Sequence, residues 1–151
     1  MSATETDLVQ TVDIQAAPSI VWELLTDATL IPRWMGRTVE ADPRPGGIFR
    51  GEINDWAHFR GEFVELVPEK RVVFSFGWEN ADPPPGASTV TITLEPVGDV
   101  TRVTLRHSGL SEVTRPQHEH GWGHYLARLA SVGGGGEPGP DPMATAPPPA
   151  G

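Results

Sequence analysis

The chain has 151 residues, the size of one domain, and its 38% hydrophobic and 21% charged residues are typical of a folded, soluble protein. It contains no cysteine, which excludes disulfides, thiolate metal sites and cysteine nucleophiles. The net charge is −9 and the 11 Lys and Arg residues are scattered, so we expect neither nucleic acid nor a membrane surface as a partner. Without a signal peptide or a long apolar run, the expected location is cytoplasmic.

Composition divides the chain into two parts. Residues 133–151 contain six Gly and six Pro but no aromatic or branched aliphatic side chain. Such a segment buries too little apolar surface to offset the entropy lost on ordering. We therefore predict a folded domain over residues 1–132 and a disordered tail over residues 133–151.

The first predicted elements are a strand and two short helices. Apolar and polar residues alternate over residues 8–15, as in a half-buried strand. Pro18 then favours the start of a helix, because its fixed φ suits the first helical turn. Residues 27–34 predict a second short helix, which Pro32 interrupts.

A run of strands is predicted between residues 38 and 107. Turn residues separate the segments 48–53, 57–66, 71–78, 88–95 and 100–107, and such short connections imply an antiparallel meander. Three of these segments alternate between a polar face and a buried face made of Val72, Phe74, Phe76, Trp78, Val90, Ile92, Leu94, Val103, Leu105 and His107. A sheet that is apolar on one side needs another element to cover it.

A helix over about residues 117–132 is predicted to provide that cover. Its apolar residues recur at steps of three and four, which places Trp122, Leu126 and Leu129 on one stripe. The expected fold is therefore α+β: a curved antiparallel sheet wrapped around a long C-terminal helix, with two short helices after the first strand.

Several local motifs follow one another in a characteristic order: Ala17-Pro18 with Val21-Trp22, Pro32-Arg33-Trp34-Met35-Gly36, Gly46-Gly47, Arg71-Val72-Val73-Phe74, Trp78-Glu79, and His118 with Gly121-Trp122. In this order the chain resembles the helix-grip fold of the START and birch-pollen-allergen (SRPBCC) superfamily. Within that superfamily it is similar to bacterial homologues of the C-terminal domain of the heat-shock protein 90 ATPase activator. The resemblance implies a hydrophobic cavity between the sheet and the long helix that suits apolar or aromatic small molecules.

The predicted ligand-binding residues surround this cavity. They are Trp34 at the mouth, a floor of Phe74, Phe76 and Trp78, a roof of Trp122, Leu126 and Leu129, and His107 as the polar contact. The alternative is that these side chains simply fill the core, because periodicity reports burial and not empty space.

The histidines invite two chemical hypotheses. His107 in an apolar cavity could bond a ligand or exchange a proton near neutral pH, or it could be satisfied by a backbone or hydroxyl partner. His118, His120 and His124 could suggest a metal site, but they lack further ligands at a suitable spacing and are expected to be solvated. We predict no metal, no cofactor and no catalytic residue.

Three functions remain open at this point, and a superfamily that includes lipid carriers, cyclases and receptors does not choose among them. The favoured one is the binding of a hydrophobic or aromatic small molecule by a monomer or homodimer. The second is a co-chaperone role on heat-shock protein 90, although eukaryotic activators carry a further N-terminal domain and only about eight residues precede the first strand here. The third is a cyclase or aromatase that uses His107. We expect a binding protein rather than an enzyme.

Overall fold

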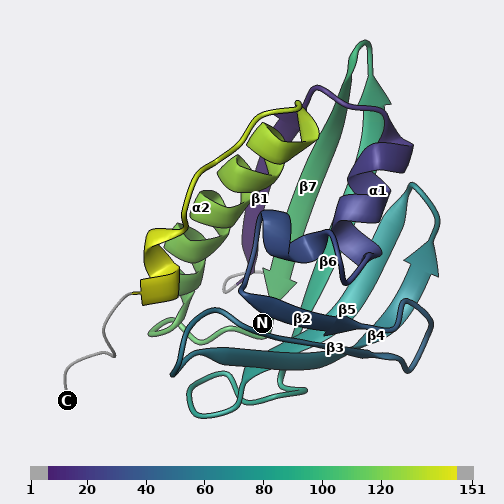
Figure 1. The fold of residues 1–151 in the computed structure, drawn as a ribbon. Coiled ribbons are helices and arrows are strands. Elements are labelled where there is room, and N and C mark those ends of the chain that lie inside the picture. The colour runs from purple at the N-terminus through teal and green to yellow at the C-terminus, as the bar shows by residue number, and fades with distance from the viewer. Residues whose placement is uncertain (1–6, 146–151) are drawn as a thin grey trace.

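A curved sheet of seven strands organises the structure, a computed structural model that describes residues 7–145. The strands are β1 (Leu8–Ile14), β2 (Thr38–Ala41), β3 (Ile48–Glu52), β4 (His58–Val67), β5 (Arg71–Trp78), β6 (Ser88–Val97) and β7 (Val100–Ser108). They lie in the order β1-β7-β6-β5-β4-β3-β2, and all neighbours are antiparallel (Figure 1). The predicted meander is therefore confirmed, and β1 extends it by pairing with β7.

The helices lie on the concave side of the sheet (Figure 1). They are the α-helices α1 (Pro18–Thr26) and α2 (Arg115–Gly133) and two short 3-10 helices, η2 (Ile31–Arg33) and η3 (Pro142–Thr145). The second predicted helix is thus reduced to one turn, because Pro32 has no amide hydrogen to extend it. No helix among residues 7–145 is long and apolar enough to cross a lipid bilayer.

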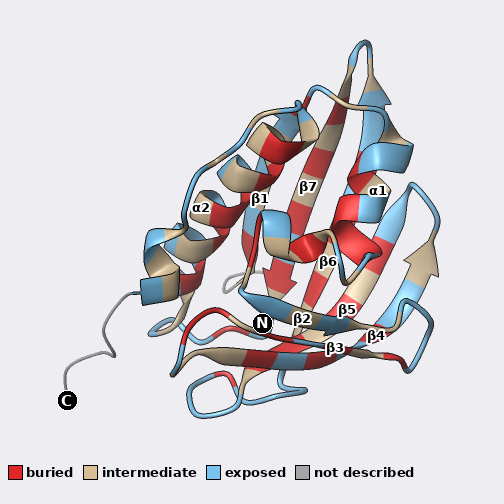
Figure 2. Ribbon diagram, viewed as in Figure 1, coloured by how far each residue is buried: buried red, intermediate tan, exposed pale blue. Residues whose placement is uncertain are grey.

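Burial follows the predicted alternation along the central strands (Figure 2). Val90, Leu105 and His107 are completely buried, while the residues between them face outward or are half-buried. One face of the sheet therefore forms the core, as the sequence pattern predicts.

Helix α2 is held against the edge strand β1 near both of its ends. Near its start, the Gln10 side chain donates a hydrogen bond of 2.6 Å to the carbonyl of Glu119. At its end, Gly133 lies so close to Ile14 that even a methyl group would collide with that side chain. Docking on β1 therefore fixes a helix that contains Gly121 and Gly123, two residues of poor helix propensity.

Residues 134–145 differ from the predicted disordered tail. They run back beside α2 towards its first turns and end in η3 (Figure 1). Asp141 accepts hydrogen bonds from two side chains of α2, and Met143 packs against the core. A few hydrogen bonds and the packing of Met143 thus position a segment whose composition alone suggests disorder. Residues 146–151 of the predicted tail lie outside the described residues.

Candidate functional site: an aromatic cavity at the start of the long helix

A cavity of about 620 Å³ opens where the first half of α2 faces β4 and β5. Its wall is completed by the β3–β4 connection, the β5–β6 loop, η3 and the region after η2. The wall residues are Met35, Ile53, Asn54, Trp56, Ala57, Phe59, Phe76, Trp78, Asn80, Ala81, Asp82, Pro116, Gln117, His118, His120, Gly121, Trp122, Tyr125 and Met143. The cavity therefore lies along the first half of α2 and does not extend to its C-terminal half.

Aromatic rings form a continuous part of this wall. The ring of Phe76 stacks on Phe59 with centroids 5.6 Å apart and meets Trp78 edge-on at 5.3 Å. On the other side, Phe76 lies 5.7 Å from Trp122 of α2. Sheet and helix thus contribute to one aromatic surface, which suits stacking against a flat or apolar ligand.

Two buried histidines hold the indole rings in place. The indole nitrogen of Trp122 donates to Nδ1 of His107 at 3.0 Å, and that of Trp78 donates to Nε2 of His118 at 2.9 Å. An indole N–H can only donate, so each of these imidazole nitrogens must be unprotonated. Trp78 and Trp122 therefore present apolar indole surface to the cavity, since their indole N–H groups are already paired.

His107 is a structural residue rather than a ligand contact. It is fully buried, its Nε2 donates to Ser88 Oγ at 2.8 Å, and the Ser88 hydroxyl donates to the Phe76 carbonyl at 2.6 Å. Burial, with a smaller effect of nearby His118, lowers the pKa of His107 to about 3. Both ring nitrogens are engaged, so the predicted contact with a ligand is replaced by a contact with Ser88.

The expectation that the helix histidines are solvated differs from the structure at His118. This side chain is buried, its Nδ1 bonds the Thr114 carbonyl at 2.8 Å, and burial lowers its pKa. His120 is exposed, and His124 is half-buried beside Asp141. Among residues 7–145, no group of three or more metal-ligating side chains is arranged to hold an ion.

The cavity brings together three of the eight predicted ligand-binding residues: Phe76, Trp78 and Trp122. The other five are Trp34, Phe74, His107, Leu126 and Leu129, and all of them are buried in the core. Trp34 does not lie at a mouth, because it is 2% exposed and its indole nitrogen donates to the Leu24 carbonyl at 2.7 Å. Towards its C-terminal end, α2 packs directly on the sheet, so side chains fill the space predicted for a ligand.

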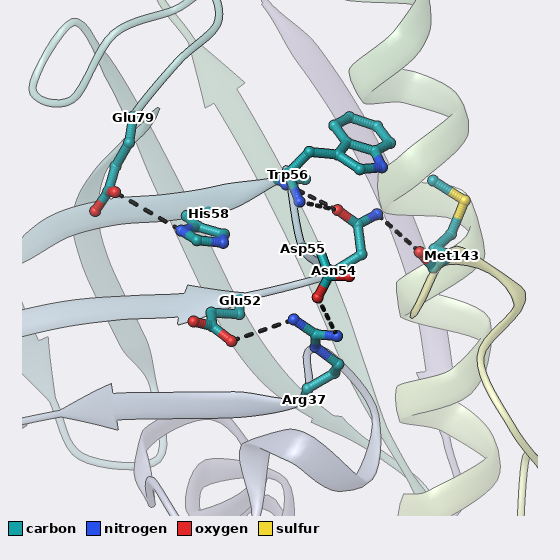
Figure 3. A network of polar contacts seen from close by, with 9 residues as sticks. Arg37, Glu52, Asn54, Asp55, Trp56, His58, Glu79 and Met143 are labelled. Carbon is teal, nitrogen blue, oxygen red and sulfur yellow. Dashed lines mark hydrogen bonds and ion pairs between the residues drawn. The ribbon is translucent and has the colours of Figure 1, made fainter. Parts of the chain in front are cut away.

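The β3–β4 connection supplies wall residues that strand periodicity could not identify. Asn54 Oδ1 accepts from the backbone amides of Trp56 and Ala57 at 3.0 and 2.8 Å, and its Nδ2 donates to the Met143 carbonyl at 2.8 Å (Figure 3). This one amide both shapes the connection and attaches the C-terminal segment to it. The Asn54-Asp55 turn signal is visible in the sequence, but its distant partner is not.

Asp141 fixes the C-terminal segment to α2. Its carboxylate accepts from Tyr125 Oη at 2.7 Å, from His124 Nε2 at 2.8 Å and from the Met143 amide at 3.0 Å. Burial opposes ionisation of Asp141, but the hydrogen bonds from Tyr125, His124 and Met143 outweigh it and lower its pKa. Because Met143 lines the cavity, these bonds also hold part of its wall.

Replacing Asp141 with asparagine is expected to loosen this segment while the sheet stays folded. The substitution removes the negative charge that accepts all three bonds, a loss of roughly 1–2 kcal/mol in a partly buried site. Hydrogen exchange of the Met143 amide should therefore accelerate about tenfold, with exchange of central β6 and β7 amides as the internal control. Unchanged exchange at Met143 would show that the Asn54 contact holds the segment without Asp141.

Comparison with known proteins identifies the family. The family model described as "Activator of Hsp90 ATPase homolog 1-like protein" matches residues 15–134. A comparison with curated proteins gave no match. The solved AHSA1-like protein of Rhizobium etli is 39% identical, with a TM-score of 0.69, and the alignment covers 96% of this chain and 93% of that one.

More distant solved structures share the fold. The Aha1 dimer of Colwellia psychrerythraea is 20% identical with a TM-score of 0.74, and the HSP90 activator of Plasmodium falciparum is 21% identical with a TM-score of 0.71. Each alignment covers 83% of this chain and 94% of the other. The match to the family model spans most of the chain and includes β2–β7 and α2, so the protein belongs to the family of activator of Hsp90 ATPase homolog 1-like proteins.

Proposed function

We propose that the protein binds an apolar, aromatic small molecule in the cavity at the start of α2. The observation that carries this proposal is a space of about 620 Å³ bounded by the rings of Phe59, Phe76, Trp78 and Trp122. Ligand pockets commonly enclose ~300–1,000 Å³ and combine apolar walls with few polar groups. Stacking on fixed indole rings favours flat ligands.

Gly121 offers a direct test, because it lines the cavity and a β-carbon there would meet no atom within 4 Å. We expect Gly121→Phe to place a ring inside the cavity and so weaken binding of the neutral fluorescent probe N-phenylnaphthylamine. The dissociation constant should rise at least tenfold, because losing about 1.4 kcal/mol of apolar contact raises it by a factor of ten. Titration followed by energy transfer from tryptophan measures the dissociation constant.

Gly123→Phe is the matched control. Gly123 is an exposed glycine of the same helix, and a side chain there would approach Gln10 rather than the cavity. Both variants replace a helical glycine and so raise helix propensity, which keeps the fold intact. The proposal is contradicted if wild-type protein does not bind the probe saturably, or if both variants weaken binding equally.

A second candidate is an action on a heat-shock protein 90 chaperone. It is favoured by membership of the activator family, and a structural neighbour from P. falciparum is described as an HSP90 activator. ATP turnover by purified chaperone, measured with and without this protein, separates the two candidates. An increase that Gly121→Phe does not alter would support a surface interaction, while unchanged turnover would remove this candidate.

The cyclase or aromatase hypothesis gains no support from the geometry. Both ring nitrogens of His107 are engaged by Ser88 and Trp122, and its side chain does not line the cavity. A general acid or base must reach the proton that it transfers, directly or through one water molecule. We therefore do not propose a catalytic role for His107.

A further inference from the structure

The charge of the cavity wall restricts which aromatic molecules it can accept. The wall residues include no lysine or arginine, whereas they do include Asp82 of the β5–β6 loop. Asp82 is exposed, and none of the ion pairs among residues 7–145 involves it. The wall therefore contains an acidic residue without a lysine or arginine to balance its charge, and its other titratable side chains include His118 and His120.

Two arginines that lie near wall residues along the chain already have anionic partners. Arg37 pairs with Asp55 at 3.0 Å and with Glu52 at 3.3 Å, on the outer side of the β3–β4 connection (Figure 3). Arg115, at the start of α2, faces Glu119 at 3.9 Å. An anionic ligand would have to compete for these cations, and the net charge of −9 would oppose its approach.

The aromatic rings of the wall favour cationic ligands. The faces of Trp, Tyr and Phe rings carry partial negative charge and attract organic cations. Trp56, Trp78, Trp122 and Tyr125 all contribute to the wall. The indole N–H groups of Trp78 and Trp122, which could have bonded a ligand anion, are used by His118 and His107.

We propose that the cavity selects aromatic amines over aromatic carboxylates, with the ring between the indoles and the ammonium group near Asp82. This inference rests on the proposed function and names its ligand class. A carboxylate would lose hydration on entry without gaining a positive partner. An ammonium group at the rim would keep part of its hydration and gain both Asp82 and the aromatic faces.

Three naphthalene compounds with different end groups test the preference: naphthylmethylamine, naphthylmethanol and naphthoic acid. Calorimetric titration at pH 7.5 should give about tenfold tighter binding of the amine than of the acid, with the alcohol between them. Asp82→Asn should raise the dissociation constant of the amine about fivefold, because an exposed ion pair contributes only modestly to binding. Binding of the uncharged alcohol should not change.

Asp99→Asn provides the matched control, because Asp99 lies in the β6–β7 hairpin, at the opposite end of β6 from the β5–β6 loop. It removes the same charge, so an equal effect of both variants would reveal net charge rather than a site at Asp82. If the acid binds as tightly as the amine, the inference is wrong while the proposed function stands. If none of the three compounds binds, the proposed function fails and this inference fails with it.

Discussion

Replacing Trp122 with phenylalanine is expected to lower the free energy of unfolding by about 2–4 kcal/mol. The substitution removes the only donor that reaches Nδ1 of His107 among the described contacts, and it leaves a buried acceptor without a partner. An unpaired buried polar group costs roughly 1–3 kcal/mol, and the smaller ring leaves additional empty volume. Urea denaturation followed by far-ultraviolet circular dichroism measures the change.

Trp78→Phe serves as the comparison for this substitution. It removes the same kind of bond, to His118, but Trp78 is only half-buried, so water can reach the vacated acceptor more easily. We expect a loss of about 1 kcal/mol for this variant. A loss below 1 kcal/mol for Trp122→Phe, or equal losses for the two variants, would show that the His107 bond does not stabilise the core.

Lowering the pH from 7 to 5 is expected to remove about 2 kcal/mol of stability through His107 alone. Its pKa is about 3 in the folded protein and 6.5 as the reference value, so the unfolded chain binds a proton that the folded state does not. The stabilisation is therefore complete above pH 6.5 and falls by about 1.4 kcal/mol per pH unit below it. The lowered pKa of His118 acts in the same direction.

His107→Gln separates this effect from general acid denaturation. The variant will be less stable at pH 7, but the slope of unfolding free energy against pH should decrease between pH 6.5 and 5, because one titrating group is absent. Denaturation curves at four or more pH values give both slopes. If the slopes are the same, His107 is not the group that couples folding to protons in this range.

The strand pattern predicted the fold because the central strands β5, β6 and β7 each have one consistently buried face. Val90, Leu105 and His107 alternate with polar neighbours, and that period of two needs no tertiary information. The same parity correctly placed His107 inside, but it could not show whether a ligand or a protein group meets the imidazole. That choice depends on Ser88 and Trp122, which lie on other elements.

The position of the cavity could not be read from periodicity. Leu126 and Trp122 belong to the same apolar stripe, yet only Trp122 faces empty space, because α2 rests directly on the sheet further along. The remaining wall depends on connections whose conformations follow from distant partners, such as the Asn54 bond to Met143 across 89 residues of sequence. Composition likewise could not predict that Asp141 accepts hydrogen bonds from α2 and from Met143 and thereby positions the C-terminal segment.

The location of Met143 makes the shape of the cavity adjustable. This side chain completes a wall of the cavity, but it is carried by a segment that lies outside the sheet and follows α2 in the chain. Changes there can alter the size and shape of the cavity without changing the strands and helices of the fold. Substitutions in a short C-terminal sequence are therefore sufficient to retune the cavity of this protein.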